Sequence, residues 1–142
     1  MAIVNISNDI ARVGLAGELV SVNAQFSAVS NPMATADTQN LIKLPPYAIV
    51  HAIQCVIDTG EGATATGDIG ISGDDITDDP NGLDDAVNFE TAAAYTFGVA
   101  GTDAGIGVNL GASGGFITLA VDNALDAAIF TLNVIYSVSE NV

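Results

Sequence analysis

The sequence predicts an all-β protein, an antiparallel β-sandwich of jelly-roll type. Segments of alternating apolar and polar residues recur along the chain, turn-forming residues separate them, and no stretch has the period of an amphipathic helix. With 142 residues, 49% of them hydrophobic, the chain is long enough for one domain with its own core. We expect a single β-sandwich domain over 18–142 and an N-terminal arm or edge segment over 1–17, where the pattern is weak.

The first half of the chain contains four predicted strands. Residues 18–29 alternate strictly, which is typical of a sheet with one wet face. Residues 38–44 form a second strand that ends at Pro45-Pro46, since proline cannot donate to a ladder. Residues 48–58 are almost continuously apolar and predict a central strand buried on both faces for part of its length. After a glycine-rich turn, residues 63–71 alternate again and predict a hairpin partner.

The second half is less regular until its end. Residues 72–86 predict a loop, because Asp and Gly dominate and Pro80-Asn81-Gly82 is turn chemistry. Two short strands are predicted near 95–99 and 106–110. Two clear strands follow, over 116–121 and 128–138.

Charge excludes several classes of partner. Seventeen acidic residues face one Lys and one Arg, both before residue 44, and ten of the acids lie between Asp58 and Glu90. Binding of nucleic acid or an anionic membrane needs Lys and Arg to contact phosphates, so neither partner is expected. The N-terminus lacks the basic and apolar regions of a signal peptide, and no apolar run has the length of a membrane helix. The sequence therefore predicts a soluble protein made in the cytoplasm.

Groups that could perform catalysis are scarce. The chain has one cysteine and one histidine and shows neither a phosphate-binding glycine loop nor a nucleophile elbow. Cys55 alternates with apolar residues and predicts a buried thiol that packs as a small hydrophobe. His51 lies within an apolar run, where a structural or interface histidine is expected. We predict no catalytic residue, no cofactor and no enzymatic activity.

One acidic cluster could bind a cation. Asp74, Asp75, Asp78 and Asp79 lie in a loop rich in Gly and Asn, and Ca²⁺ takes six to eight oxygen ligands of this kind. The spacing does not match an EF-hand loop. The alternative is a solvated acidic loop that keeps the protein soluble.

The composition of the chain suggests that its sheet edges are covered by other subunits. Exposed edges are usually protected by lysine, which this chain almost lacks. Its core is also rich in small residues, so contact with neighbouring subunits would add stability. We therefore expect an oligomer.

Residues 38–138 resemble small β-rich structural proteins encoded in tailed-bacteriophage genomes. The resemblance rests on four segments: Leu44–Val50, Ala63–Gly70, Asp79–Asp85 and Leu125–Phe130. The first 37 residues do not take part in it.

The resemblance implies a virion protein, namely a capsid decoration or cement protein on the outer surface of a phage head. It implies a homotrimer, a major capsid protein lattice as the partner, and the capsid surface as the location. Because Arg12 and Lys43 are the only fixed cations, we take them as candidate partner contacts, with the N-terminal segment touching the capsid.

Three alternatives stay open. The chain could be a tail- or fibre-associated virion protein, since these share the β-rich style. It could also be a carbohydrate- or host-surface-binding β-sandwich, with or without Ca²⁺, although it has no Trp and only Tyr47, Tyr95 and Tyr136 as tyrosines. An acidic, lysine-poor surface is also typical of proteins adapted to salt.

Overall fold

Eight strands make up the structure, a computed structural model that describes residues 19–92, 95–97 and 103–139. No helix occurs in these residues. The strands are β1 (Leu19–Ser27), β2 (Thr38–Leu44), β3 (Ala48–Thr59), β4 (Thr66–Ser72), β5 (Asp79–Asn88), β6 (Tyr95–Phe97), β7 (Gly115–Val121) and β8 (Ile129–Val138). The predicted segment 1–17, and Arg12 with it, lies outside the described residues.

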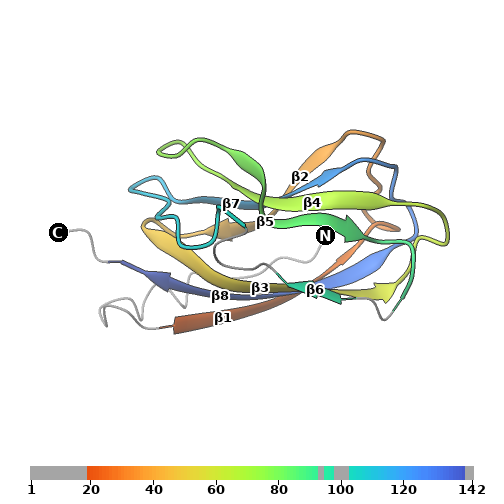
Figure 1. Cartoon of the computed structure of the whole chain (residues 1–142), viewed down its shortest axis with the longest axis horizontal. Coiled ribbons are helices and arrows are strands. Elements are labelled where there is room, and N and C mark those ends of the chain that lie inside the picture. The colour runs from red at the N-terminus through yellow and green to blue at the C-terminus, as the bar shows by residue number, and fades with distance from the viewer. Residues whose placement is uncertain (1–18, 93–94, 98–102, 140–142) are drawn as a thin grey trace.

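The strands form two four-stranded sheets, β1-β8-β3-β6 and β2-β7-β4-β5, stacked as the two layers of a sandwich (Figure 1). The pairings are nested: β1 pairs with β8, β2 with β7, β3 with β6 and β4 with β5, all antiparallel. This is one long hairpin, with its turn between β4 and β5, rolled into two sheets. Such an arrangement is a jelly roll, and the predicted fold class is confirmed.

The core lies between the two sheets. In β1, for example, Val20, Val22, Ala24 and Phe26 are buried while the residues between them face outward. Phe130 of β8 packs its ring 5.5 Å from that of Phe26, and 5.2 Å from that of Phe89 in an edge-to-face arrangement. Since Phe89 directly follows β5 of the other sheet, these rings join the two layers.

Strand β3 differs from the prediction, because only one of its faces is buried. Two β-bulges, at His51 and at Asp58, each place two residues of β3 opposite one residue of β8. The residue pairs His51-Ala52 and Asp58-Thr59 are therefore exposed side by side. The sequence did not reveal which face is buried, because some outward-facing residues are apolar too. Ile49 and Val56 face outward and are half-buried.

The predictions for 63–86 are partly wrong. The fourth strand begins only at Thr66, and it pairs with β5 and β7 rather than with the strand before it. The predicted loop 72–86 contains most of β5. This edge strand shifts its register twice against β4 and contains Pro80, which gives it the composition of a loop.

Of the two short strands predicted in the second half, one is present and the other is not. Strand β6 lies within the predicted 95–99, of which the last two residues are outside the described part. The predicted strand 106–110 is absent: this segment forms turns and a single bridge between Asn109 and Ile49.

Candidate functional site

A row of neutral polar side chains crosses the outer face of the sheet that contains β1, β8 and β3. Asn23, Asn133 and Gln54 are register partners on these three strands. The Asn23 Nδ2 donates to Asn133 Oδ1, and the Asn133 Nδ2 donates to Gln54 Oε1 at 3.1 Å. The three amides therefore form one continuous hydrogen-bond chain across the strands.

The neighbouring row ends at the only acidic residue within these three strands. At the second bulge of β3, Asp58 Oδ2 accepts hydrogen bonds from Gln25 Nε2 at 3.1 Å and from Thr131 Oγ1 at 2.5 Å. We call this outward surface, formed by the side chains of Asn23, Gln25, Gln54, Thr131 and Asn133, the amide face. Its polar groups bond mainly to one another, so much of their hydrogen-bonding capacity is already satisfied.

Apolar side chains lie beside the amide face. Leu19 at the start of β1 is 60% exposed, and Ile135 of β8 is 39% exposed. Because β1 is an edge strand of its sheet, this apolar surface continues to a sheet edge. A surface that is mostly neutral, partly apolar and next to an edge that pairs with no described strand is suited to contact with another protein.

His51 lies at the other end of this sheet, at the first bulge. Its Nε2 is 2.6 Å from the hydroxyl oxygen of Ser137 on β8. This distance would suit a nucleophile and its base. However, no described carboxylate bonds to the second ring nitrogen, and the pair lies on the outer face of a sheet rather than in a cleft. The arrangement supports the predicted structural or interface histidine.

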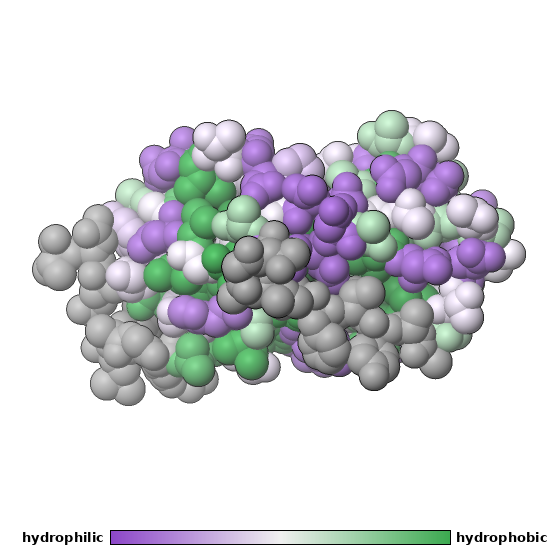
Figure 2. Space-filling view, viewed as in Figure 1, coloured by the Kyte–Doolittle hydropathy of each residue, from purple (hydrophilic) through white to green (hydrophobic). Residues whose placement is uncertain are grey.

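Carboxylates gather on the opposite sheet. The β4–β5 hairpin, residues 66–88, carries seven of them: Asp68, Asp74, Asp75, Asp78, Asp79, Asp84 and Asp85. We call this segment the acidic hairpin. Figure 2 shows hydrophilic residues over the upper half of the molecule, where β4 and β5 lie. Partial burial raises the pKa of Asp68, and the carboxylates of Asp85 and Asp122 raise it further, although the Ala86 N–H that it accepts at 2.9 Å opposes the shift.

The four predicted Ca²⁺ ligands serve partly as loop acceptors. Asp75 Oδ2 accepts the Ser113 N–H at 2.8 Å, and Asp78 Oδ1 accepts the Gly73 N–H at 3.1 Å. Within the described residues, no three His, Cys, Asp or Glu side chains lie close enough together to hold a metal ion. Calcium binding by Asp74, Asp75, Asp78 and Asp79 stays a prediction.

A polar cleft of about 250 Å³ opens beside the acidic hairpin. Its wall is formed by the β4–β5 loop, by the segment that leads into β7, and by Phe116 of β7. The residues that line it are Asn40, Ser72, Gly73, Asp74, Asp78, Ser113, Gly114, Gly115 and Phe116. Three separate segments of the chain form this cleft, so no local sequence pattern predicts it.

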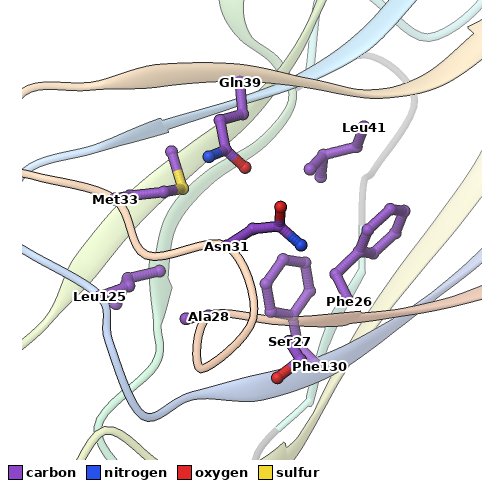
Figure 3. A pocket seen from close by; sticks show the side chains of 9 residues that line it. All are labelled: Phe26, Ser27, Ala28, Asn31, Met33, Gln39, Leu41, Leu125 and Phe130. Carbon is purple, nitrogen blue, oxygen red and sulfur yellow. The ribbon is translucent and has the colours of Figure 1, made fainter. Parts of the chain in front are cut away.

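A second, apolar crevice lies between the two sheets, where β1 and β2 leave the sandwich open. Figure 3 shows Phe26, Leu41 and Phe130 around it, with the amides of Asn31 and Gln39 extending into the same space. Its volume is about 10 Å³, enough for one water molecule at most. It therefore offers no ligand site.

The remaining sequence-predicted residues are placed clearly. Cys55 is fully buried, and burial, followed by the nearby carboxylates of Asp84 and Asp58, raises its pKa to about 12. The predicted burial of this thiol is confirmed. Lys43 is exposed on the outer face of β2, where it lies opposite Phe116 and forms no ion pair with a described residue. It is therefore on the other sheet from the amide face.

One acid that the sequence did not single out holds two loops together. Glu61, in the β3–β4 loop, accepts the N–H groups of Asp126, Ala127 and Ala128 at 3.0, 3.0 and 2.8 Å. These backbone bonds lower the pKa of Glu61 despite the opposing effect of burial. A side-chain hydrogen bond with Glu61, and then the charge of Glu61, raise the pKa of Asp126. Glu61 thus fastens the β7–β8 loop to the β3–β4 loop.

Comparison with known proteins identifies the fold. No protein family matches the sequence, and no curated protein is similar to it in sequence. In structure, the chain is similar to one in the capsid of Ralstonia phage GP4, with a TM-score of 0.64 and 18% identity over 89% of this chain and 88% of that chain.

Two further phage structures contain similar chains. One belongs to the acidic stable capsid structure of Helicobacter pylori bacteriophage KHP30, with a TM-score of 0.58 and 16% identity over 86% of this chain and 89% of that one. The other belongs to the capsid asymmetric unit of cyanophage Pam1, with a TM-score of 0.54 and 18% identity over 85% and 84%. At this identity the likeness shows a shared fold, which agrees with the resemblance in sequence. No described helix has the length and apolar content needed to cross a membrane.

Proposed function

We propose that this chain is a structural protein of a bacteriophage virion, a decoration or cement protein that binds the outer surface of the head as a homotrimer. The observation that carries the proposal is the fold likeness, over 85–89% of this chain, to three chains from phage capsid structures. The sequence resemblance to virion proteins of tailed phages supports it independently. A cement protein stabilises a shell by contact alone, which fits a chain with one His and one buried Cys.

The distribution of charge supports the amide face as the contact with the shell or with neighbouring copies. At a net charge of −15, two copies repel each other wherever carboxylates meet. One carboxylate, that of Asp58, borders the amide face, and both of the hydrogen bonds to it come from side chains of this face. Contact there desolvates few charges, so it costs less than contact through the acidic hairpin.

The N-terminal segment with Arg12 remains a candidate contact with the capsid, since it leads directly into β1 at the edge of the amide face. Lys43 also remains a candidate partner contact, on the other sheet. The acidic hairpin then faces away from the shell, where its charge limits unspecific adhesion.

The test is an image reconstruction of the virions that contain this chain. The expected result is trimeric density on the outer surface of the head, with β1, β8 and β3 turned towards the shell or towards neighbouring copies. Density on a tail or fibre would instead favour the alternative virion role. Virions without any bound copy would overturn the proposal.

A deletion of residues 1–15 tests the role of the N-terminal segment. Purified protein with and without the deletion is added to heads that lack it, and retention is measured by sedimentation. We expect the deletion to reduce occupancy, and unchanged occupancy would contradict this contact.

A further inference from the structure

The polar cleft beside the acidic hairpin contains an aromatic side chain that faces outward. In β7, inward-facing residues are buried, whereas Phe116 points to the outer face and is half-buried. Its register partners are Lys43 on β2 and Ser72 on β4. A phenyl ring on a wet sheet surface is unusual for a residue that normally belongs to the core. It is one of the residues that line the cleft, where it is the only aromatic residue.

Hydrogen-bonding side chains stand around this ring. Asn40 contributes an amide, Ser72 and Ser113 contribute hydroxyls, and Asp74 and Asp78 contribute carboxylates. Together they offer both donors and acceptors within one small cleft. A ligand that matches this set has an apolar face and several hydroxyl groups around its rim.

The walls of the cleft are held by hydrogen bonds within the chain. The β4–β5 loop is closed by the bond from Gly73 N–H to Asp78, and it is tied to the segment before β7 by the bond from Ser113 N–H to Asp75. The two segments approach so closely that a Cβ on Gly73 would lie 2.8 Å from the Gly114 carbonyl oxygen. The cleft is therefore preformed, which lowers the entropic cost of binding.

The negative charge of the cleft limits which ligands can bind. Two carboxylates line the cleft, and the chain carries a net charge of −15, so an anionic ligand is repelled. Carboxylates accept hydrogen bonds from hydroxyl groups well. The volume of about 250 Å³ is below the range of roughly 300–1,000 Å³ that is usual for drug-sized ligands. One sugar ring satisfies all of these conditions.

We propose that this cleft binds a neutral sugar ring, which stacks on Phe116 while its hydroxyl groups bond to Asn40 and to Asp74 or Asp78. This function goes beyond shell binding and is physically separate from it, because the amide face lies on the other sheet. A protein that covers a particle surface through one sheet could thus present a sugar site on the opposite sheet.

The test is a titration of the isotope-labelled full chain with N-acetylglucosamine, glucose or galactose, followed by amide chemical shifts. At least one sugar is expected to give saturable shifts at Gly73, Gly114 and their neighbours, with a dissociation constant of about 1 mM or weaker. The shifts should persist in the presence of a chelator, since no metal is required. Glucuronic acid is expected to bind at least about tenfold more weakly than the preferred neutral sugar.

Two variants test the residues. Phe116→Leu keeps apolar volume but removes the flat ring, and Asn40→Ala removes one amide, so each is expected to weaken binding about tenfold. Thr38→Ala changes an exposed residue on β2 outside the cleft and serves as the matched control. The amide spectrum of each variant shows whether it is folded.

Three results would overturn this inference. They are the absence of saturable shifts with all three neutral sugars, binding by folded Phe116→Leu that equals that of the original chain, and loss of binding on chelation. None of them affects the proposed role on the phage head, which is tested by the position of the chain in virions.

Discussion

The amide face and the acidic hairpin present water with two different kinds of polar surface. On the amide face, Asn23, Asn133 and Gln54 bond to each other, and the one carboxylate nearby has two side-chain donors. In the acidic hairpin, seven carboxylates lie within 66–88 and only Lys43 among the described residues could balance them. Both surfaces are hydrophilic in composition. They differ in the free energy needed to remove water from them, which is far lower for paired neutral amides than for carboxylates.

The comparison shows why net charge alone describes this protein poorly. A value of −15 suggests repulsion everywhere, yet the strands β1, β8 and β3 contain a single acidic residue. Each sheet therefore favours a different partner. One surface suits contact with protein, and the other suits solvent or a small hydroxyl-rich ligand.

The largest effect is expected from a charge placed beside the amide face. Ile135→Glu puts a carboxylate at a partly exposed position of β8, where the contact with the shell or a neighbouring copy would have to bury it. We expect at least about a tenfold loss of self-association or head binding, measured by analytical ultracentrifugation and sedimentation with heads.

Thr38→Glu is the control for this variant. It adds the same charge to an exposed position of β2, on the other sheet. If both variants bind equally well, or equally poorly, the amide face is not the contact surface.

A smaller effect is expected where the carboxylate of Glu61 holds two loops together. Glu61→Gln keeps the shape of the side chain but removes the charge that accepts three N–H groups, and its amide turns a donor towards one of them. We expect a loss of about 1–2 kcal/mol in the free energy of unfolding, measured by urea denaturation. Glu90→Gln, at an exposed position after β5, should change it little. If the free energy of unfolding of Glu61→Gln equals that of the original chain, the loops do not depend on this carboxylate.

Removal of the Asn133 amide, the central one of the three, should lower the free energy of unfolding by about half as much. Asn133→Ala breaks the bonds to Asn23 and Gln54 at once, while water can reach the groups that are left. The expected loss is about 1 kcal/mol, measured in the same urea experiment. Asn81→Ala, at an exposed position of the edge strand β5, is the matched comparison, and an equal loss there would mean that the amide chain contributes nothing special.

The smallest effect is a gain in stability in the acidic hairpin. Asp68→Asn keeps an oxygen for the Ala86 N–H but removes a charge beside Asp85 and Asp122. We expect the free energy of unfolding to rise by about 0.5 kcal/mol at neutral pH. A decrease would show that Asp68 is stabilising in its charged form.

The same groups predict a pH profile with two parts. The folded-state pKa values of Asp68 and Asp126 are raised, so their destabilising effect is present at neutral pH and is relieved as pH falls through those raised values. The pKa of Glu61 is lowered below 4.5, so its contribution is present above that value and is lost as pH falls through the lowered one. Thermal melting from pH 7 downward should show a rise in Tm and then a fall. In Asp68→Asn the rise should shrink. In Glu61→Gln the fall should shrink, and so should the part of the rise that comes from Asp126, because Glu61 is what raises the pKa of Asp126.

The sequence predicted those parts of the fold that follow from local pattern. Strand β1 alternates cleanly, and the bounds of β1, β2, β7 and β8 were predicted to within one or two residues. Strand β5 was missed because an edge strand with register shifts and a proline has no regular period. The bulges of β3 could not be foreseen either, since an inserted residue changes which side chains face outward without changing the composition.

The candidate sites were harder to predict for a related reason. The amide face depends on the register between residues far apart in sequence, and Phe116 looked like any core residue of a strand. Only pairing with β2 and β4 shows that its neighbours are Lys43 and Ser72. The acidic cluster was visible at once, but composition could not tell that two of its carboxylates bond to loop backbone.

The nested pairing of the strands also sets the order in which the molecule can be completed. The amide face joins Asn23 to Asn133, which are 110 positions apart, so β1 has no partner until nearly the whole chain has left the ribosome. Such long-range closure is slow, and a half-made chain exposes unpaired strands. An unfinished or truncated copy lacks β8 and cannot form this face at all. The amide face is therefore the last surface to form, so a contact made through it would exclude every copy that ends before β8.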